Sequence, residues 1–436
     1  MKASVPAQLF KIFDLYRKSF AGLPRKVWLL SLVLLVNRSG AMVVAFLSVY
    51  LIDKQGFEPI KASYVMAAFG FGGILGNYIG GLLNDRFGSW HIQLYSMVGA
   101  GVLNILLGQM TEFWSLCLLA FSISLWADAF RPANRAAIAI YAPPERLTQA
   151  YGLQRMAVNL GFSIGPALGG YLIYNYGFEL MFWGDGLTFL LAALVFFFAL
   201  PADETAKPLV ARPDAKLKQV TDAPSTNLAP AAPPAHKQLW LMAFVMANMG
   251  IMVCFFQLFS TFPVYLKESG LDERAIGWLF TLSGIVIVSL EMPAIYAVER
   301  RFKPIPVMLV GSCLIILAYF ILPGIVTFGF LGVLLMVLIL TVGEILYMPF
   351  TNTYVSTHAP PARRGEYLGV LSASYSAAFV FTPLIGFRVA DWYGYGAATF
   401  TCCAFAGIGW LILSRANKIR AAENARANQL TGQASV

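Results

Sequence analysis

The sequence has few charged residues for its length. Only 12% of its 436 residues are charged, against roughly 25% in an ordinary soluble domain, while 58% are hydrophobic. A soluble protein of this size cannot bury so much apolar surface in one core. The composition therefore excludes a soluble globular domain and predicts an all-α protein that crosses the lipid bilayer many times.

The sequence also has few histidines and lacks the motifs of metal and nucleotide sites. The chain has 3 His and 5 Cys, and the cysteines lie in apolar segments without the spacing of a metal site. His91, His236 and His358 lie at loops or helix ends, which excludes a hydrolase site within the membrane. The G-x-x-x-x-G-K-[ST] motif is absent, so ATP is not expected to drive the protein. We expect neither an enzyme nor a bound cofactor or metal.

What the chain does have is a series of apolar runs, each of about 20 residues or more and therefore long enough to cross roughly 30 Å of hydrocarbon. We predict twelve spans, at residues 27–52, 60–83, 91–111, 113–142, 150–176, 179–201, 238–266, 275–298, 305–325, 328–357, 366–390 and 395–414. The first run lacks an A-x-A-like cleavage site, so no removable signal peptide is expected.

The stretch from Asp128 to Gly177 has a weaker copy 217 positions later, the distance from Pro132 to Pro349. No gap is needed over the repeat. The matches include Ala142-Pro143-Pro144 with Ala359-Pro360-Pro361, Arg146 with Arg363, Gly152 with Gly369, Phe162 with Phe379, Pro166 with Pro383, Gly169 with Gly386, and Tyr176-Gly177 with Tyr393-Gly394. Because Pro, Arg and Gly residues match at this constant spacing, the sequence predicts two equivalent six-helix bundles. Such a repeat is typical of alternating-access transporters.

The repeat divides the chain into an N-terminal tail (1–26), a bundle (27–201), a linker (202–237), a second bundle (238–414) and a C-terminal tail (415–436). The linker is rich in Pro, Ala, Lys and Asp and is predicted to be disordered. Most of the 31 Lys and Arg fall in the tails, the linker and the loops on one side, which predicts that both termini are cytoplasmic. Because these basic residues are scattered, nucleic-acid binding is not expected.

The loop after the second span has the sequence Gly81-Leu82-Leu83-Asn84-Asp85-Arg86-Phe87-Gly88. It resembles the G-x-L-x-D-R-x-G signature of the major facilitator superfamily, although Ser89-Trp90 replace the basic residues that follow it there. The resemblance implies twelve helices in two pseudo-symmetric bundles. It also implies a gate on the cytoplasmic side, made here by Gly81, Asp85, Arg86, Gly88, Glu145 and Arg146, because a carboxylate at a helix end can pair with Arg or accept from N–H groups.

The fifth span contains Gly161-x-x-x-Gly165-Pro166-x-x-Gly169-Gly170. This pattern resembles the superfamily's antiporter signature, and the resemblance implies exchange of a substrate for protons, as in the drug/proton antiporter branch. Small residues at this spacing also give a flat face for close helix packing, with a bend at the proline. The Arg-x-x-x-Gly signature of that branch is missing from the fourth span, which has Asp128-x-x-Arg131-Pro132-x-x-Arg135 instead.

Ionisable side chains at membrane depth normally face a cavity or a partner. In the resembling family, spans one, four, seven and ten line the cavity, which implies that Arg38, Asp128, Arg131 and Glu344 face one central chamber. Asn37, Asn248 and Glu291 complete the predicted substrate and proton cavity, whereas Arg135, Arg155 and Asp185 are expected nearer the membrane surface. Asp128 has arginines nearby and Glu344 has no base in its own span, so Glu344 is the expected proton carrier.

These observations predict a secondary active transporter in a bacterial-type inner membrane, a monomer that uses the proton gradient to export small organic molecules. Import of peptides, siderophores or other charged metabolites, a lipid flippase and a non-transporting sensor are the alternatives. Arg38 and Arg131 are expected to bind substrate anions or to keep Asp128 ionised.

The linker composition gives a first testable prediction. Deleting about ten residues between Lys207 and Ala232 should leave expression and transport near wild type, because a flexible tether tolerates a change of length at small entropic cost. Expression in membranes and uptake or efflux by the same vesicles would be measured. A well-folded deletion variant without activity would show that the linker does more than connect the bundles.

Overall fold

A computed structural model describes residues 22–202, 234–299, 301–360 and 363–433. These residues form helices joined by short turns, and they contain no β-strand. The predicted all-α class is confirmed.

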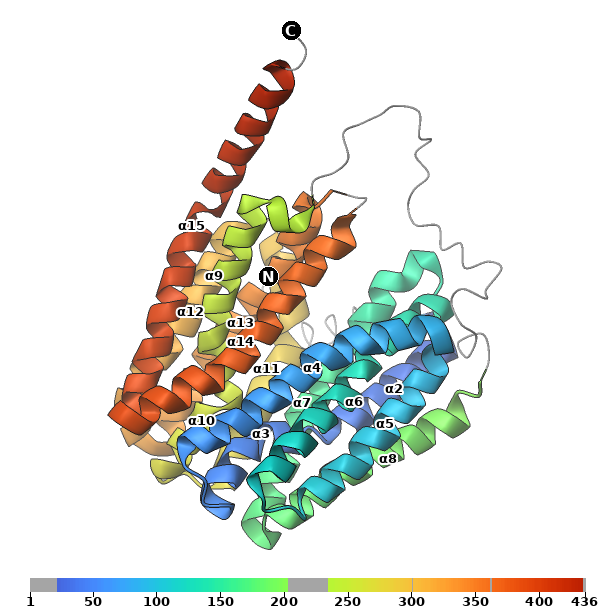
Figure 1. Ribbon diagram of the computed structural model, residues 1–436, viewed down its shortest axis with the longest axis vertical. Helices are drawn as coiled ribbons and strands as arrows, with labels where there is room; N and C mark the ends of the chain where they lie inside the picture. Colours follow the sequence, from blue (N-terminus) through green and yellow to red (C-terminus); the bar gives the residue numbers. More distant parts are fainter. Residues whose placement is uncertain (1–21, 203–233, 300, 361–362, 434–436) are drawn as a thin grey trace, which may run out of the picture.

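The first half of the chain forms one bundle, from α2 to α8 (Figure 1). Its elements are α2 (Arg25–Ser39), α3 (Met42–Val49), the π-helix η1 (Tyr50–Lys54), α4 (Pro59–Phe87), α5 (Ser89–Leu107), α6 (Phe113–Tyr141), η2 (Pro144–Arg146), α7 (Leu147–Tyr176) and α8 (Phe178–Ala199).

The second half forms the other bundle, from α9 to α15. Its elements are η5 (Ala235–Lys237), α9 (Leu239–Phe255), η6 (Phe256–Phe259), α10 (Thr261–Glu268), α11 (Glu273–Glu299), α12 (Pro304–Ile325), η7 (Val326–Phe328), α13 (Gly329–His358), α14 (Arg364–Tyr393) and α15 (Tyr395–Gln433).

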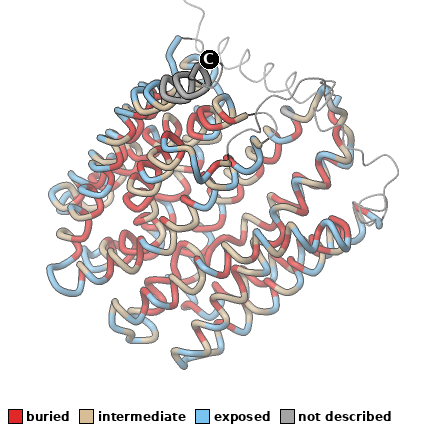
Figure 2. Tube along the Cα trace, turned by 45° about the horizontal axis from the view of Figure 1, so that its top comes forward, coloured by how far each residue is buried: buried red, intermediate tan, exposed pale blue. Residues whose placement is uncertain are grey.

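The described helices account for all twelve predicted spans. Eleven continuous helical stretches are long and apolar enough to cross a membrane, and the stretch Pro304–His358 contains two of the spans, α12 and α13, which η7 separates. Figure 2 shows buried residues on the helix faces that turn toward other helices. Large apolar side chains such as Trp114, Phe198 and Leu331 are 73–75% exposed on the outer faces, where lipid would cover them.

Two predicted boundaries differ from the structure. Residues 203–233 of the linker lie outside the described part of the chain, but Ala235–Lys237 form a 3₁₀ turn. Disorder up to residue 237 is therefore wrong, because Ala235 is buried and its N–H donates to the Glu366 carboxylate at the start of α14. At the other end, α15 continues from the predicted span into the predicted tail, as far as Gln433.

The sequence repeat is also a repeat of structure. Pro132 lies inside α6 and Pro349 inside α13, so both proline-containing helices occupy matching places. Gly177 joins α7 to α8 with φ of 85°, and Gly394 joins α14 to α15 with φ of 82°. L-residues with side chains rarely adopt this backbone conformation, which explains why glycine stands at both positions.

The two bundles pack against each other through α4 with α14 and α7 with α11, and α3 contacts α10 and η6 at one end of the molecule. The closest approach is between α7 and α11. A Cβ atom on Gly277 would overlap the carbonyl oxygen of Pro166, and one on Gly170 would overlap that of Glu273. These glycines therefore bring the backbones of the two bundles into direct contact.

Gly277→Ala should weaken this contact, because the new methyl group meets backbone rather than a movable side chain. Overpacking of this kind costs about 1–3 kcal/mol, and we expect a lower melting temperature of the purified protein in detergent. Gly407→Ala is the matched control, since a Cβ there has open space around it. Equal melting temperatures for the two variants would contradict a close backbone contact at Gly277.

Candidate functional site

A cavity of about 250 Å³ lies between the two bundles. The N-terminal bundle supplies most of its polar side chains, and the C-terminal bundle closes it mainly with aromatic ones, from η6 and α14. The polar wall includes Asn37, Arg38, Asn104, Asp128, Arg131 and Asp185, and the opposite wall consists of Phe256, Phe259, Tyr375, Ser376 and Phe379. The cavity can therefore hold both a polar group and an apolar body.

Four predicted cavity residues line this cavity, namely Asn37, Arg38, Asp128 and Arg131. Arg131 Nε lies 2.8 Å from Asp128 Oδ1, one helical turn away on α6. The Arg38 guanidinium lies over the ring of Phe162, 5.8 Å from its centroid, and makes no ion pair with a described carboxylate. It interacts electrostatically with Arg131 and Asp128, so the three charges form one group.

The first span is broken beside this group. α2 ends at Ser39 and α3 begins at Met42, and the Ala41 N–H turns back to the carbonyl oxygen of Arg38 at 3.1 Å. A Cβ atom on Gly40 would overlap Thr188 of α8, so only glycine fits there. The break places Arg38 at the end of α2, directly on the cavity.

Asp185 of α8 lies at the same break and lines the central cavity, a place that the sequence does not predict for it. Its side chain is 3% exposed, and its Oδ2 accepts the Val43 N–H of α3 at 3.1 Å. A carboxylate at the N-terminus of a helix is stabilised by the helix dipole and by the free N–H groups there. The signal in the sequence was an acid in the interior of an apolar span.

Glu344 lies away from this cavity. It lines a separate small cavity with Leu258, Phe280 and Ser283, and its carboxylate makes no hydrogen bond or ion pair with another described residue. The repeat explains the difference, because Ile345, not Glu344, is the equivalent of Asp128. One residue along an α-helix turns a side chain by about 100°.

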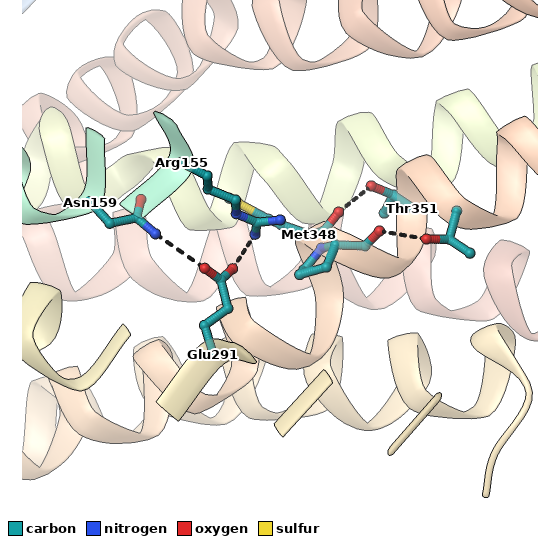
Figure 3. Close-up of polar contacts among 7 residues, drawn as sticks. Arg155, Asn159, Glu291, Met348 and Thr351 are labelled. Atoms are coloured by element: carbon teal, nitrogen blue, oxygen red, sulfur yellow. Dashed lines mark hydrogen bonds and ion pairs between the residues drawn. The ribbon is translucent and has the colours of Figure 1, made fainter. Parts of the chain in front are cut away.

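Asn248 and Glu291 do not line the central cavity either. Asn248 connects three helices of one bundle, since its Nδ2 donates to Ser374 Oγ at 2.8 Å and its Oδ1 accepts from the Tyr347 hydroxyl at 3.1 Å. Glu291 of α11 is held by Arg155 and Asn159 of α7, the latter at 3.1 Å (Figure 3). This ion pair joins the two bundles, a role the sequence did not reveal for Arg155.

The predicted gate residues lie at one end of the N-terminal bundle. Gly88 turns the chain from α4 into α5 with φ of 84°, as the motif requires. Asp85 is exposed and accepts a hydrogen bond from its neighbour Asn84 at 3.3 Å, and Arg86 lies over the ring of Phe87. Gly81 is on α4, while Glu145 and Arg146 form part of η2.

The antiporter-like motif is a packing surface with two sides. Gly161 and Gly165 face the break in the first span, where a Cβ atom would meet Arg38 and Ala41, and Gly169 faces Met42. Gly170 faces α11 instead. Pro166 lies between the two sets, inside α7. The motif thus holds the broken first span and the second bundle against one helix.

Proteins of similar sequence are membrane transporters. An uncharacterized MFS-type transporter, YqjV, of Bacillus subtilis is 25% identical over 84% of this chain and 87% of its own length. A Na(+), Li(+), K(+)/H(+) antiporter of Planococcus maritimus is 24% identical over 83% and 88%. The multidrug resistance protein MdtH of Aeromonas hydrophila is 26% identical over 78% and 82%.

Solved structures share the fold. A crystal structure of the peptide transporter POT superposes with a TM-score of 0.75 over 92% of this chain and 96% of the other, at 18% identity. The sequence profile of the Major Facilitator Superfamily matches residues 27–383, which is most of the chain. Two repeated bundles around one central cavity agree with that match, and the chain is a multi-pass membrane transporter that belongs to the Major Facilitator Superfamily.

Proposed function

We propose that the protein is a secondary active transporter that works by alternating access and exports small organic molecules in exchange for protons. The antiporter and multidrug resistance relatives support exchange and export. We place it as a monomer in the inner membrane, with both termini in the cytoplasm.

The central cavity is the main observation that supports this proposal. It lies between the bundles, where relative movement of the bundles opens it to one side or the other. The bundles touch at the end formed by α3, η6 and α10. With cytoplasmic termini this is the outer end, and contact there is what we expect of an inward-facing state. The cavity volume is near the lower end of the roughly 300–1,000 Å³ of small-molecule sites.

Arg38 favours a second candidate, an importer of peptides, siderophores or other charged metabolites. Its guanidinium makes no ion pair with a described carboxylate and faces the cavity. Arginine binds carboxylate and phosphate groups through two parallel hydrogen bonds, which suits an anionic or zwitterionic solute. The direction of solute movement under an imposed pH gradient in oriented vesicles distinguishes the two candidates.

Glu344→Gln tests the proton carrier predicted from the sequence. The carboxylate has no described partner, so removing its charge leaves no other group unpaired. Solute-induced proton flux into proteoliposomes, followed with an internal pH dye, should fall at least tenfold, while solute binding persists. Normal flux in this variant would remove Glu344 from the coupling mechanism.

Asp128→Asn should act differently, because it removes the partner of Arg131. Since the Arg131 side chain is 47% exposed, we expect a loss of stability of only about 1 kcal/mol or less. Solute binding should weaken instead, measured by the ligand-induced rise in melting temperature. Unchanged binding together with lost flux would give Asp128, rather than Glu344, the role of proton carrier.

Asp85→Asn tests the cytoplasmic gate. Asp85 is exposed in this structure, so we propose that its charge contacts form in the outward-facing state, and removing the charge should shift the population inward. Labelling of a single cysteine placed in the central cavity, from the cytoplasmic side, should become several-fold faster. Unchanged labelling would exclude Asp85 from gating.

A further inference from the structure

Three buried polar atoms without a hydrogen-bond partner lie in the wall of the central cavity. They are Asn37 Nδ2, Asn104 Oδ1 and Asp185 Oδ1, and their residues are only 1–3% exposed. They come from three different helices, α2, α5 and α8. Native proteins leave few buried polar atoms unpaired, so three around one cavity point to a missing ligand.

Asp185 and Asn104 lie at the same level of the bundle. α5 and α8 run in opposite directions, and Gly101 faces Gly186 while Gly108 faces Phe182. Along α5, Asn104 lies between Gly101 and Gly108. Along α8, Asp185 lies between Phe182 and Gly186, the residues that face those two glycines. Asp185 Oδ1 also faces the backbone of Gly40, where the first span is broken.

The unpaired atoms of these two residues are hydrogen-bond acceptors. Asn104 Nδ2 donates to the Ala100 carbonyl at 3.0 Å, which fixes its Oδ1 toward the other side. Asp185 Oδ2 already accepts from Val43, so Oδ1 is the free carboxylate oxygen. A buried acceptor that is left without a donor destabilises the protein. Two buried oxygen acceptors at one level of the cavity wall, neither with a hydrogen-bond donor, form an environment that favours a cation or a proton.

We propose that Asp185 Oδ1 and Asn104 Oδ1 bind the small monovalent cation that drives transport, a proton or an alkali metal ion. Carboxylate and carbonyl oxygens are the ligands that hard cations prefer. The proposal rests on the function proposed above and adds a cation site to it. This site lies at the back of the first span, between α5 and α8, and acts together with Glu344 of the second bundle, not in its place.

The charges around Asp185 fit this assignment. On α2, Arg38 acts on Asp185 electrostatically without an ion pair in contact, and Arg38 in turn interacts with Asp128 and Arg131 of α6. α3, α5 and α7 face α8 here with uncharged residues, namely Met42, Val43, Asn104 and Leu172.

Cation binding at this site can affect the contact between the two bundles through α3. The charge of Asp185 stabilises the N-terminus of α3, and α3 contacts α10 of the other bundle. A bound cation neutralises the charge of Asp185 and weakens the electrostatic interaction of Asp185 with both α3 and Arg38. Cation binding thereby changes the end at which the bundles touch and the arginine that faces the solute.

The test measures binding and does not depend on transport. The melting temperature of the purified full-length protein in detergent is recorded with NaCl, LiCl or KCl replacing choline chloride at fixed pH, and then from about pH 5 to 9 in choline chloride alone. A ligand that binds the native state raises its stability with concentration. We expect the wild type to respond in one of the two series, which identifies the ion as alkali metal or proton.

Asp185→Asn should remove that response or shift its midpoint at least tenfold. Glu273→Gln is the matched control, because Glu273 is a carboxylate of similar burial outside the cavity, and it should respond as the wild type does. Should Asp185→Asn fail to fold, Asn104→Ala keeps the carboxylate and should still weaken the response about tenfold. A wild type without response in both series, or variants that keep it, would overturn the proposal. A normal response in a protein that moves no solute would instead contradict the proposed function alone.

Discussion

The close packing of α7 is the constraint on which the rest of this structure depends. One side of the helix, at Gly161 and Gly165, holds the broken first span, and the other, at Gly170, meets the second bundle. Without side chains at these positions the backbones approach to contact distance, and dispersion contacts replace the hydrophobic effect, which is weak between helices in lipid. One helix thereby fixes both the shape of the central cavity and the contact between the bundles.

The distribution of charge follows from the cost of burying it. Asp128 has Arg131, Glu291 has Arg155, and Asp185 has the N-terminus of α3, so three of the intramembrane carboxylates are paired or capped. Glu344 and Arg38 are two exceptions among the described residues. In a membrane such exceptions are costly and mark groups whose partner arrives with a ligand or a proton.

Polar contacts between the bundles and polar contacts around the cavity involve different residues. Arg155 and Glu291 join the bundles directly (Figure 3), whereas Arg38, Asp128 and Arg131 surround the solute cavity. A contact between bundles must change when one bundle moves against the other, and a contact within one bundle need not. Under the proposed alternating access, this separation would allow the cavity to keep its polar wall while the bundles move.

The sequence by itself determined the membrane class, the twelve spans and the two-fold repeat. These follow from the length of apolar runs and from the positions of Pro and Gly, which are local. The resemblance to a known family implied that Arg38, Asp128 and Arg131 share one cavity. The one-residue offset of Glu344 from the repeat agrees with its displacement from the cavity. The tertiary structure alone decided the role of Asp185 and the pairing of Arg155 with Glu291. Both contacts join residues that are more than a hundred positions apart in the chain, and packing between helices, not local sequence, brings such residues together.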